Sequence, residues 1–203
     1  MKIDLANLGV RDAHSVMVDV VVPRPIAWVS TVGEDGVFNL APFSAYSIVS
    51  VKPAVVGFNV GATRDGRKKD TVRNIEYAKG FVINVVDETL AQMMNVTAAP
   101  FPPEVDEFKK AGLTAVMANL VQAPMVAESS IKIECRLNQI LKFGETSKVS
   151  SFIIGDVLRV HVRDDLYVDG KVQMSKLKAI GRLGGGGDVY CRTGDSFEMV
   201  RPA

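Results

Sequence analysis

The chain has 203 residues, of which 47% are hydrophobic and 23% are charged, and its formal net charge is +1. This composition is ordinary for a folded globular protein and argues against intrinsic disorder. A charge near zero excludes a global electrostatic attraction to nucleic acid or to an anionic membrane, so any basic site must be local. The length favours a single domain, which we expect to span residues 1–203.

The ends and the cysteines of the chain indicate a cytoplasmic protein. Residues 1–14 lack the apolar core and the small-residue cleavage site of a secretory signal peptide. No span approaches the ~18 consecutive apolar residues that a transmembrane helix needs. Cys135 and Cys191 are far apart in the sequence and fit reduced thiols better than a disulfide framework. We therefore expect a cytoplasmic location and no membrane partner.

The first elements in chain order are an ambiguous apolar run and a hairpin. Residues 13–22 are mostly apolar, and periodicity alone does not assign such a short run to helix or strand. Two prolines then end the run. Residues 26–32 are predicted to form a strand, and the turn residues 33–36 join it to residues 37–40 as an antiparallel hairpin.

The segment after this hairpin, residues 39–44, is predicted to be a ligand-facing loop. Pro42 removes a backbone donor and restricts Ala41 to extended geometry. We expect such a segment to pair incompletely in a ladder. Its remaining amides would then be free to face a ligand.

A strand, a helix and another strand follow. Residues 54–60 are predicted to form the second strand, and residues 69–78 a short helix. Asp70 is the expected N-cap of this helix, and Gly80 is expected to end it. The apolar residues 81–86 predict a buried strand.

The second half of the chain predicts two helices and then long strands. Residues 87–96 and 104–111 have helical patterns. Residues 130–138 alternate apolar and polar side chains, as half-buried antiparallel strands do, and residues 149–162 predict another such strand, bent at Gly155. Strands without regular intervening helices favour a mainly β fold with peripheral helices, an antiparallel barrel rather than a doubly wound sheet.

Several short motifs carry a resemblance to a known family. They are Arg24-Pro-Ile-Ala27, Val29-Ser-Thr31, Asn39-x-Ala-Pro-x-Ser44, Lys69-Asp-Thr71 and Phe81-Val-Ile-Asn84. In this order and spacing they resemble the flavin reductase-like family of FMN-binding split barrels, which includes flavoredoxin. The resemblance continues through Gly155-Asp-Val157 and Arg182-Leu-Gly-Gly185. It implies an antiparallel split β-barrel that binds FMN.

A basic loop, residues 64–71, precedes the predicted helix start. Cations beside the free amides of a helix N-terminus suit a dianionic phosphate such as that of FMN. Judged by its residues alone, this loop is more often a solvated charged loop. The resemblance assigns Lys69 and Thr71 to the phosphate and leaves Arg67 and Lys68 open.

Small polar residues on the hairpin and the loop after it are the other candidates for the flavin site. The resemblance implies that they contact the ribityl chain and the isoalloxazine ring, with the backbone of the loop at the ring edge. The alternative is that they only cap turns. The candidates are Ser30, Thr31, Asn39, Ala41, Pro42, Ser44 and Ala45.

Other cofactor and catalytic motifs do not match. The run Gly61-x-x-x-x-Gly66 is not followed by the Lys-Ser/Thr pair of a P-loop, and residues 184–187 lack the register of a dinucleotide fingerprint. His14 and His161 have no partners at metal-ligand spacing, so we expect no metal site. A position for His161 near a nicotinamide stays open.

Together, the residues and the resemblance predict a homodimeric FMN-binding oxidoreductase. It would be an NAD(P)H-dependent flavin reductase that passes electrons through FMN to an acceptor such as an oxygenase. The flavin would take hydride from the nicotinamide, so no dedicated catalytic acid or base is required. The homodimer follows from the resemblance alone. The alternative is a non-catalytic, flavoredoxin-like electron carrier. A split-barrel oxidase of pyridoxal type is less favoured by the Asn39-x-Ala-Pro-x-Ser44 segment.

Overall fold

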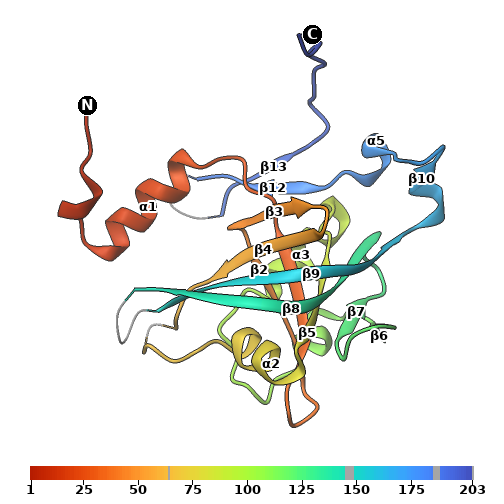
Figure 1. Ribbon diagram of the computed structural model, residues 1–203, viewed down its shortest axis with the longest axis horizontal. Coiled ribbons are helices and arrows are strands. Elements are labelled where there is room, and N and C mark those ends of the chain that lie inside the picture. The colour runs from red at the N-terminus through yellow and green to blue at the C-terminus, as the bar shows by residue number, and fades with distance from the viewer. Residues whose placement is uncertain (64, 145–148, 185–187, 203) are drawn as a thin grey trace.

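A seven-stranded antiparallel sheet is the centre of the molecule (Figure 1). The computed structural model describes residues 1–63, 65–144, 149–184 and 188–202. The strands lie in the order β2-β1-β5-β8-β9-β4-β3, and every neighbouring pair is antiparallel. They are β1 (Ala27–Val32), β2 (Phe38–Phe43), β3 (Tyr46–Val51), β4 (Ala54–Val60), β5 (Gly80–Asn84), β8 (Ile131–Phe143) and β9 (Ser150–Val162).

The two edge strands of this sheet, β2 and β3, follow one another in the chain. Only Ser44 and Ala45 separate them, so the sheet must curl until its edges approach. The Asn59 amide of β4 donates a hydrogen bond to the Ala45 carbonyl at 2.8 Å, which holds this bend against the sheet. The edges are therefore joined by a bend instead of a ladder, and the predicted antiparallel split β-barrel is confirmed.

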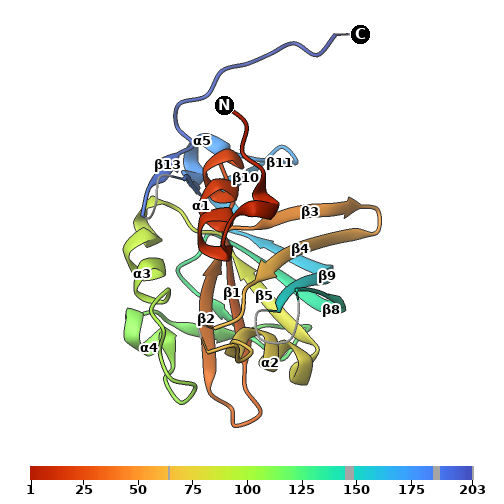
Figure 2. The ribbon, with the colours of Figure 1, turned by 90° about the vertical axis from the view of Figure 1, so that its left-hand side faces the viewer.

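The helices and the remaining short strands lie around the barrel, as predicted for a mainly β fold with peripheral helices (Figures 1 and 2). The helices are α1 (Val10–Val20), α2 (Asp70–Ala78), α3 (Ala91–Val96), α4 (Glu107–Ala111) and α5 (Met174–Leu177). The short strands are β6 (Ala115–Met117), β7 (Pro124–Val126), β10 (Tyr167–Val168), β11 (Lys171–Val172), β12 (Ile180–Arg182) and β13 (Tyr190–Arg192).

The barrel interior is the main hydrophobic core. Val29, Phe58 and Phe81 are fully buried there, and Val72 and Ile75 of α2 pack into the same cluster. Because neighbouring residues of a strand point to opposite faces, Trp28 turns away from this interior. It packs under α3 and α4, and its indole N–H donates to Thr97 Oγ1 at 2.9 Å. Trp28 is therefore a core residue.

Residues 39–43 are part of strand β2 and do not form the expected loop, while Ser44 lies just outside the strand. Strand β2 pairs with β1 along its whole length, with Ala41 opposite Val29 and Pro42 opposite Trp28. The reason is that β2 is an edge strand. One side of such a strand needs no partner, so a proline without an N–H is tolerated there.

Two local boundaries also differ from the expected ones. The N-cap of α2 is Lys69 rather than Asp70, and the left-handed residue after the helix is Lys79, with φ of 55°. Gly80 instead begins β5, where a Cβ atom would come within 2.8 Å of Val121. Of residues 13–22, which periodicity leaves unassigned, residues 13–20 belong to helix α1, which buries none of its residues, and residues 21 and 22 follow it.

Candidate functional site

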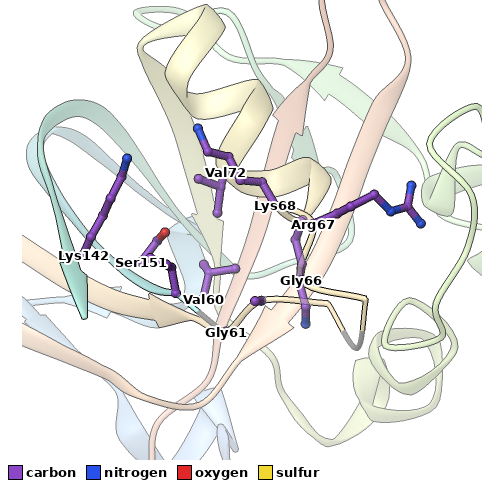
Figure 3. Close-up of a pocket in the computed structure, with 11 residues that line it drawn as sticks. Val60, Gly61, Gly66, Arg67, Lys68, Val72, Lys142 and Ser151 are labelled. Carbon is purple, nitrogen blue, oxygen red and sulfur yellow. The ribbon is translucent and has the colours of Figure 1, made fainter. Parts of the chain in front are cut away.

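A cavity of about 200 Å³ lies between the loop after β4, the start of α2 and the paired ends of β8 and β9 (Figure 3). In Figure 3, Lys142 and Ser151 stand on the strand side, across from the loop residue Gly66. The polar lining of the cavity is strongly cationic. It comprises Arg67, Lys68, Lys69, Lys142 and Ser151.

The four cations of this lining differ in how their charges are compensated. Arg67 forms an ion pair with Asp65 at 2.6 Å, and Lys68 forms one with Glu76 at 2.7 Å. Neither Lys69 nor Lys142 has a carboxylate partner among the residues that the structure describes. Arg67 and Lys68, left open by the sequence, are thus already paired, whereas Lys69 and Lys142 carry charges that no carboxylate in the described ranges pairs with.

Lys69 holds its ammonium inward although the residue as a whole is exposed. Its Nζ atom lies 5.7 Å from the centroid of the Phe43 ring, close enough for a cation–π contact. Crowding by protein atoms removes water from the ammonium and lowers the pKa of Lys69. This cation sits at the N-cap of α2, where the first amides of a helix lack intrahelical acceptors. The combination favours an anion in the cavity.

Thr71, the second predicted phosphate residue, does not turn its side chain into the cavity. The residue is buried, and its hydroxyl donates to Asn39 Oδ1 at 2.9 Å. Its amide lies in the first turn of α2, next to Lys69. A phosphate contact by Thr71 therefore remains a prediction that would involve the amide instead of the hydroxyl.

Asn39 and Thr31 belong to a buried polar network with Thr71, Asn74 and Glu107. Asn39 Nδ2 donates to Glu107 Oε1 at 3.0 Å, and Thr31 Oγ1 donates to Asn39 Oδ1 at 3.3 Å. Asn74 Nδ2 donates to Thr31 Oγ1 at 3.1 Å. Members of this network satisfy one another, so the side chains of Thr31 and Asn39 already have partners before any ligand arrives.

Glu107 was not singled out by the sequence. Its Oε2 atom accepts the Leu40 amide at 3.1 Å, and burial raises the pKa of Glu107 to about 7. A glutamate in the first turn of a predicted helix is normally solvated and favourable there, so its residue type gives no signal of burial.

Ser30 lies on the opposite face of β1 from Thr31, away from the cavity. It is fully buried, donates to the Pro124 carbonyl and accepts from Asn84 Nδ2 at 3.0 Å. The structure therefore does not bring Ser30 together with Lys69. Its flavin contact stays a prediction.

The bend between β2 and β3 carries the remaining candidates. Ala45 is exposed, Ser44 is partly buried, and Ala41 and Pro42 lie in the edge strand just before them. The bend is adjacent to the cavity because Phe43, which contacts Lys69, immediately precedes Ser44. The cavity is not lined by any of these four candidates, which flank Phe43 in the sequence: Ala41, Pro42, Ser44 and Ala45.

Arg24 anchors this bend. The residue is buried, and its Nε atom donates to Ser44 Oγ at 3.5 Å. The guanidinium also donates to the carbonyls of Val18, of Val21 at 2.8 Å and of Leu183 at 3.1 Å. One side chain therefore joins the end of α1, the bend and the segment after β12.

His161 lies outside the cavity and has a partner. Its Nε2 atom is 2.6 Å from Glu134 Oε1, and Glu134 Oε2 accepts the Leu120 amide at 2.6 Å. Within the described residues no group of three or more His, Cys, Asp or Glu side chains is arranged to hold a metal ion. Residues 185–187 of the glycine run lie outside the described residues.

No helix in the described residues combines the length and the apolar character that a membrane crossing requires.

The fold and the cavity define the class of this protein: a split barrel of the flavin reductase type, with a cationic cavity beside the bend that joins its edge strands. The family model described as "Flavin reductase like domain" matches residues 20–175, and the chain belongs to this family. An uncharacterized protein of Halalkalibacterium halodurans is 37% identical over 204 residues, covering 100% of this chain and 97% of that protein.

Two solved structures are similar over nearly the whole chain. Nitrilotriacetate monooxygenase component B from Bacillus cereus is 33% identical, covers 98% of both chains and superposes with a TM-score of 0.92. The 2-nitrobenzoate 2-nitroreductase NbaA of Pseudomonas fluorescens is 27% identical, with 100% of this chain and 96% of the other covered and a TM-score of 0.88. Family membership gives the chain a flavin-linked oxidoreductase role.

Proposed function

We propose that this protein binds FMN and acts as an NAD(P)H-dependent flavin reductase that passes electrons through FMN to an acceptor. The observation that carries the proposal is the Lys69 ammonium. It is crowded by protein, and it has no carboxylate partner among the described residues. Removing a cation from water without an opposite charge is unfavourable, and a bound phosphate dianion would compensate it.

The cavity fits the phosphate end of FMN rather than the whole molecule. Its volume of about 200 Å³ is below the range of roughly 300–1,000 Å³ that is usual for pockets holding a complete small ligand. Lys69, Lys142 and the first amides of α2 would hold the phosphate. The rest of the cofactor would extend toward the bend at Ser44 and Ala45, because Phe43 connects that bend to Lys69.

In this scheme the chain binds, orients and shields, while FMN when bound supplies the redox chemistry by accepting hydride from the nicotinamide. Arg24 holds the bend in place through Ser44. Thr71 keeps the first turn of α2 fixed through its bond to Asn39. The proposal needs no catalytic acid or base.

We further propose a homodimer whose interface includes strand β3. Ile48 is 71% exposed and Val51 is 85% exposed on this edge strand, and Val49 between them is also exposed. The hairpin of β3 and β4 projects from the body of the molecule (Figure 2). An unpaired apolar edge favours pairing with another chain, and a second copy would also cover the flavin that extends from the small cavity.

The likeness to component B of a monooxygenase supports an oxygenase as the electron acceptor. The likeness to a nitroreductase supports a small nitroaromatic acceptor as the second candidate. We place the protein in the cytoplasm, since both cysteines are free thiols.

The decisive test is anaerobic reduction of the FMN-loaded protein by NADH or NADPH alone. Loss of the flavin absorbance band on mixing supports the reductase. Bleaching that occurs only after a separate reductase is added would replace it with the electron carrier, and no FMN loading at all would overturn both.

A further inference from the structure

The buried polar network connects a short helix on the barrel surface to the start of α2. On one side, Glu107 of α4 accepts the Asn39 amide group and the Leu40 backbone amide of β2. On the other side, Asn39 Oδ1 accepts a hydrogen bond from the Thr71 hydroxyl, and Thr71 lies two residues after Lys69, the N-cap of α2. Within the described residues, Asn39 therefore connects Glu107 to Thr71 through one side chain.

The orientation of Asn39 depends on Glu107. An ionised carboxylate has acceptors but no donor, so the Asn39 NH₂ group must face it. The Oδ1 atom is then directed toward the Thr71 and Thr31 hydroxyls, both of which donate to it. If Glu107 takes up a proton, it can donate to Asn39, and the carboxamide is no longer held in one orientation.

We propose that Glu107 is a positioning residue of the anion site: through Asn39 it fixes Thr71, and with it the first turn of α2 that presents Lys69 and the helix amides to the cavity. This inference rests on the proposed function only for the identity of the anion. We call the path from Glu107 through Asn39 to Thr71 the relay. It consists of residues of this chain alone, so it can be tested without flavin.

The relay should respond to pH near neutrality, because burial of the Glu107 carboxyl raises its pKa to about 7. The charged groups around Glu107 are few. From α2, Asp70 acts on it as a like charge and is itself paired with Arg73. Strand β2 and helix α3, which pack against α4, carry no titratable side chain. The remaining charges, Asp106, Lys109 and Lys110, lie on α4 or at its N-cap.

The test is a pH titration of backbone ¹⁵N–¹H chemical shifts in the flavin-free protein. In the wild type, the amides of Leu40 and Thr71 should shift with one common midpoint near pH 7. Both transitions should vanish in Glu107→Gln. The matched control is Glu104→Gln, an exposed carboxylate before α4, which should leave both transitions in place.

A second variant keeps the proposal falsifiable if Glu107→Gln does not fold. Thr71→Val removes the hydroxyl but keeps the shape, so Leu40 should still titrate near pH 7 while the amide at position 71 should not. FMN titrations then connect the relay to the site. Each variant should weaken FMN binding about 5- to 10-fold, and the double variant should be no weaker than either, because both break one path.

The proposal is overturned if Leu40 titrates in the wild type but Thr71 does not, since Glu107 would then act on β2 alone. It is equally overturned if the transition at Thr71 survives in Glu107→Gln, or if the two variants weaken FMN binding additively. A wild-type protein that shows the shared titration but no FMN affinity would refute the proposed function and leave the relay standing.

Discussion

Lys69 is the residue on which the proposed phosphate site depends most. Its ammonium is drawn over the Phe43 ring, while the neighbouring Arg67 and Lys68 are neutralised by Asp65 and Glu76. A cation that is kept partly out of water, with no carboxylate partner in the described part of the chain, is costly for the free protein. That cost is offset when an anion binds, which is why we attribute phosphate binding to this side chain.

The raised pKa of a second residue, Glu107, predicts how the stability of the protein depends on pH. Its pKa in the folded protein is about 7, above the ordinary value of 4.5. A carboxyl with a raised pKa binds its proton more tightly in the folded than in the unfolded chain, so its contribution to stability is present at low pH and is lost as pH rises from about 5 to 8.

Urea unfolding at pH 5.5 and pH 8 measures this effect. Relative to Glu107→Gln, the wild-type protein should lose about 1 to 3 kcal/mol of unfolding free energy between the two pH values. If the difference between wild type and variant is the same at both pH values, Glu107 does not titrate in this range. The exposed-site variant Glu104→Gln should follow the wild type.

Among the elements, strand β3 forms the interface of the proposed homodimer, in which a second copy would cover the flavin. Its exposed side chains Ile48 and Val51 leave an apolar edge next to the bend that precedes it. Replacing Val51 with Lys places a charge on this edge, and charged edge residues oppose strand pairing.

We therefore expect Val51→Lys to shift the protein from dimer to monomer in sedimentation velocity experiments, with weaker FMN retention. The control is Val116→Lys on β6, where a similar exposed valine lies away from β3. A wild-type protein that sediments as a monomer would contradict the dimer directly. So would a Val51→Lys variant that remains dimeric.

Several elements could be predicted from the sequence because their signals are local. The hairpin of β1 and β2, the strand β4 and the helix α2 follow from alternation, turn residues and apolar periodicity. The pairing of Pro42 could not be predicted, because it depends on β2 being an edge strand, which is set by the whole sheet. Strand β3 was missed for a related reason: its run of exposed apolar residues does not alternate.

Some residues of the candidate site could also be predicted from local sequence signals, and others could not. Lys69 could be found because a basic loop before a helix is visible in the sequence. Glu107 could not, since its burial arises from α4 packing against β2, residues that are 67 and 68 positions away in the chain. Ser30 and Thr31 are neighbours in sequence but face opposite sides of β1, so only one of them joins the network at the site.

At the scale of the whole molecule, the barrel supplies a rigid support and the loop after β4 supplies the charge. Helix α2 closes one end of the barrel with Val72 and Ile75, and its first turn is held by the buried polar network. The cationic cavity therefore sits at a fixed position relative to the bend at Ser44. In the proposed function, this position would hold the phosphate end of FMN and leave its other end accessible to a nicotinamide.

In the proposed function, the cavity at Lys69 binds the phosphate of FMN. Riboflavin has the same ring and ribityl chain without the phosphate, so the ratio of the two dissociation constants isolates that contact. Measured by quenching of flavin fluorescence, FMN should bind at least about tenfold more tightly than riboflavin, as a charge-assisted hydrogen bond would provide. Lys69→Ala should reduce that ratio severalfold, whereas Lys171→Ala, an exposed lysine on β11, should not change it. Equal affinities for FMN and riboflavin in the wild-type protein would contradict the account.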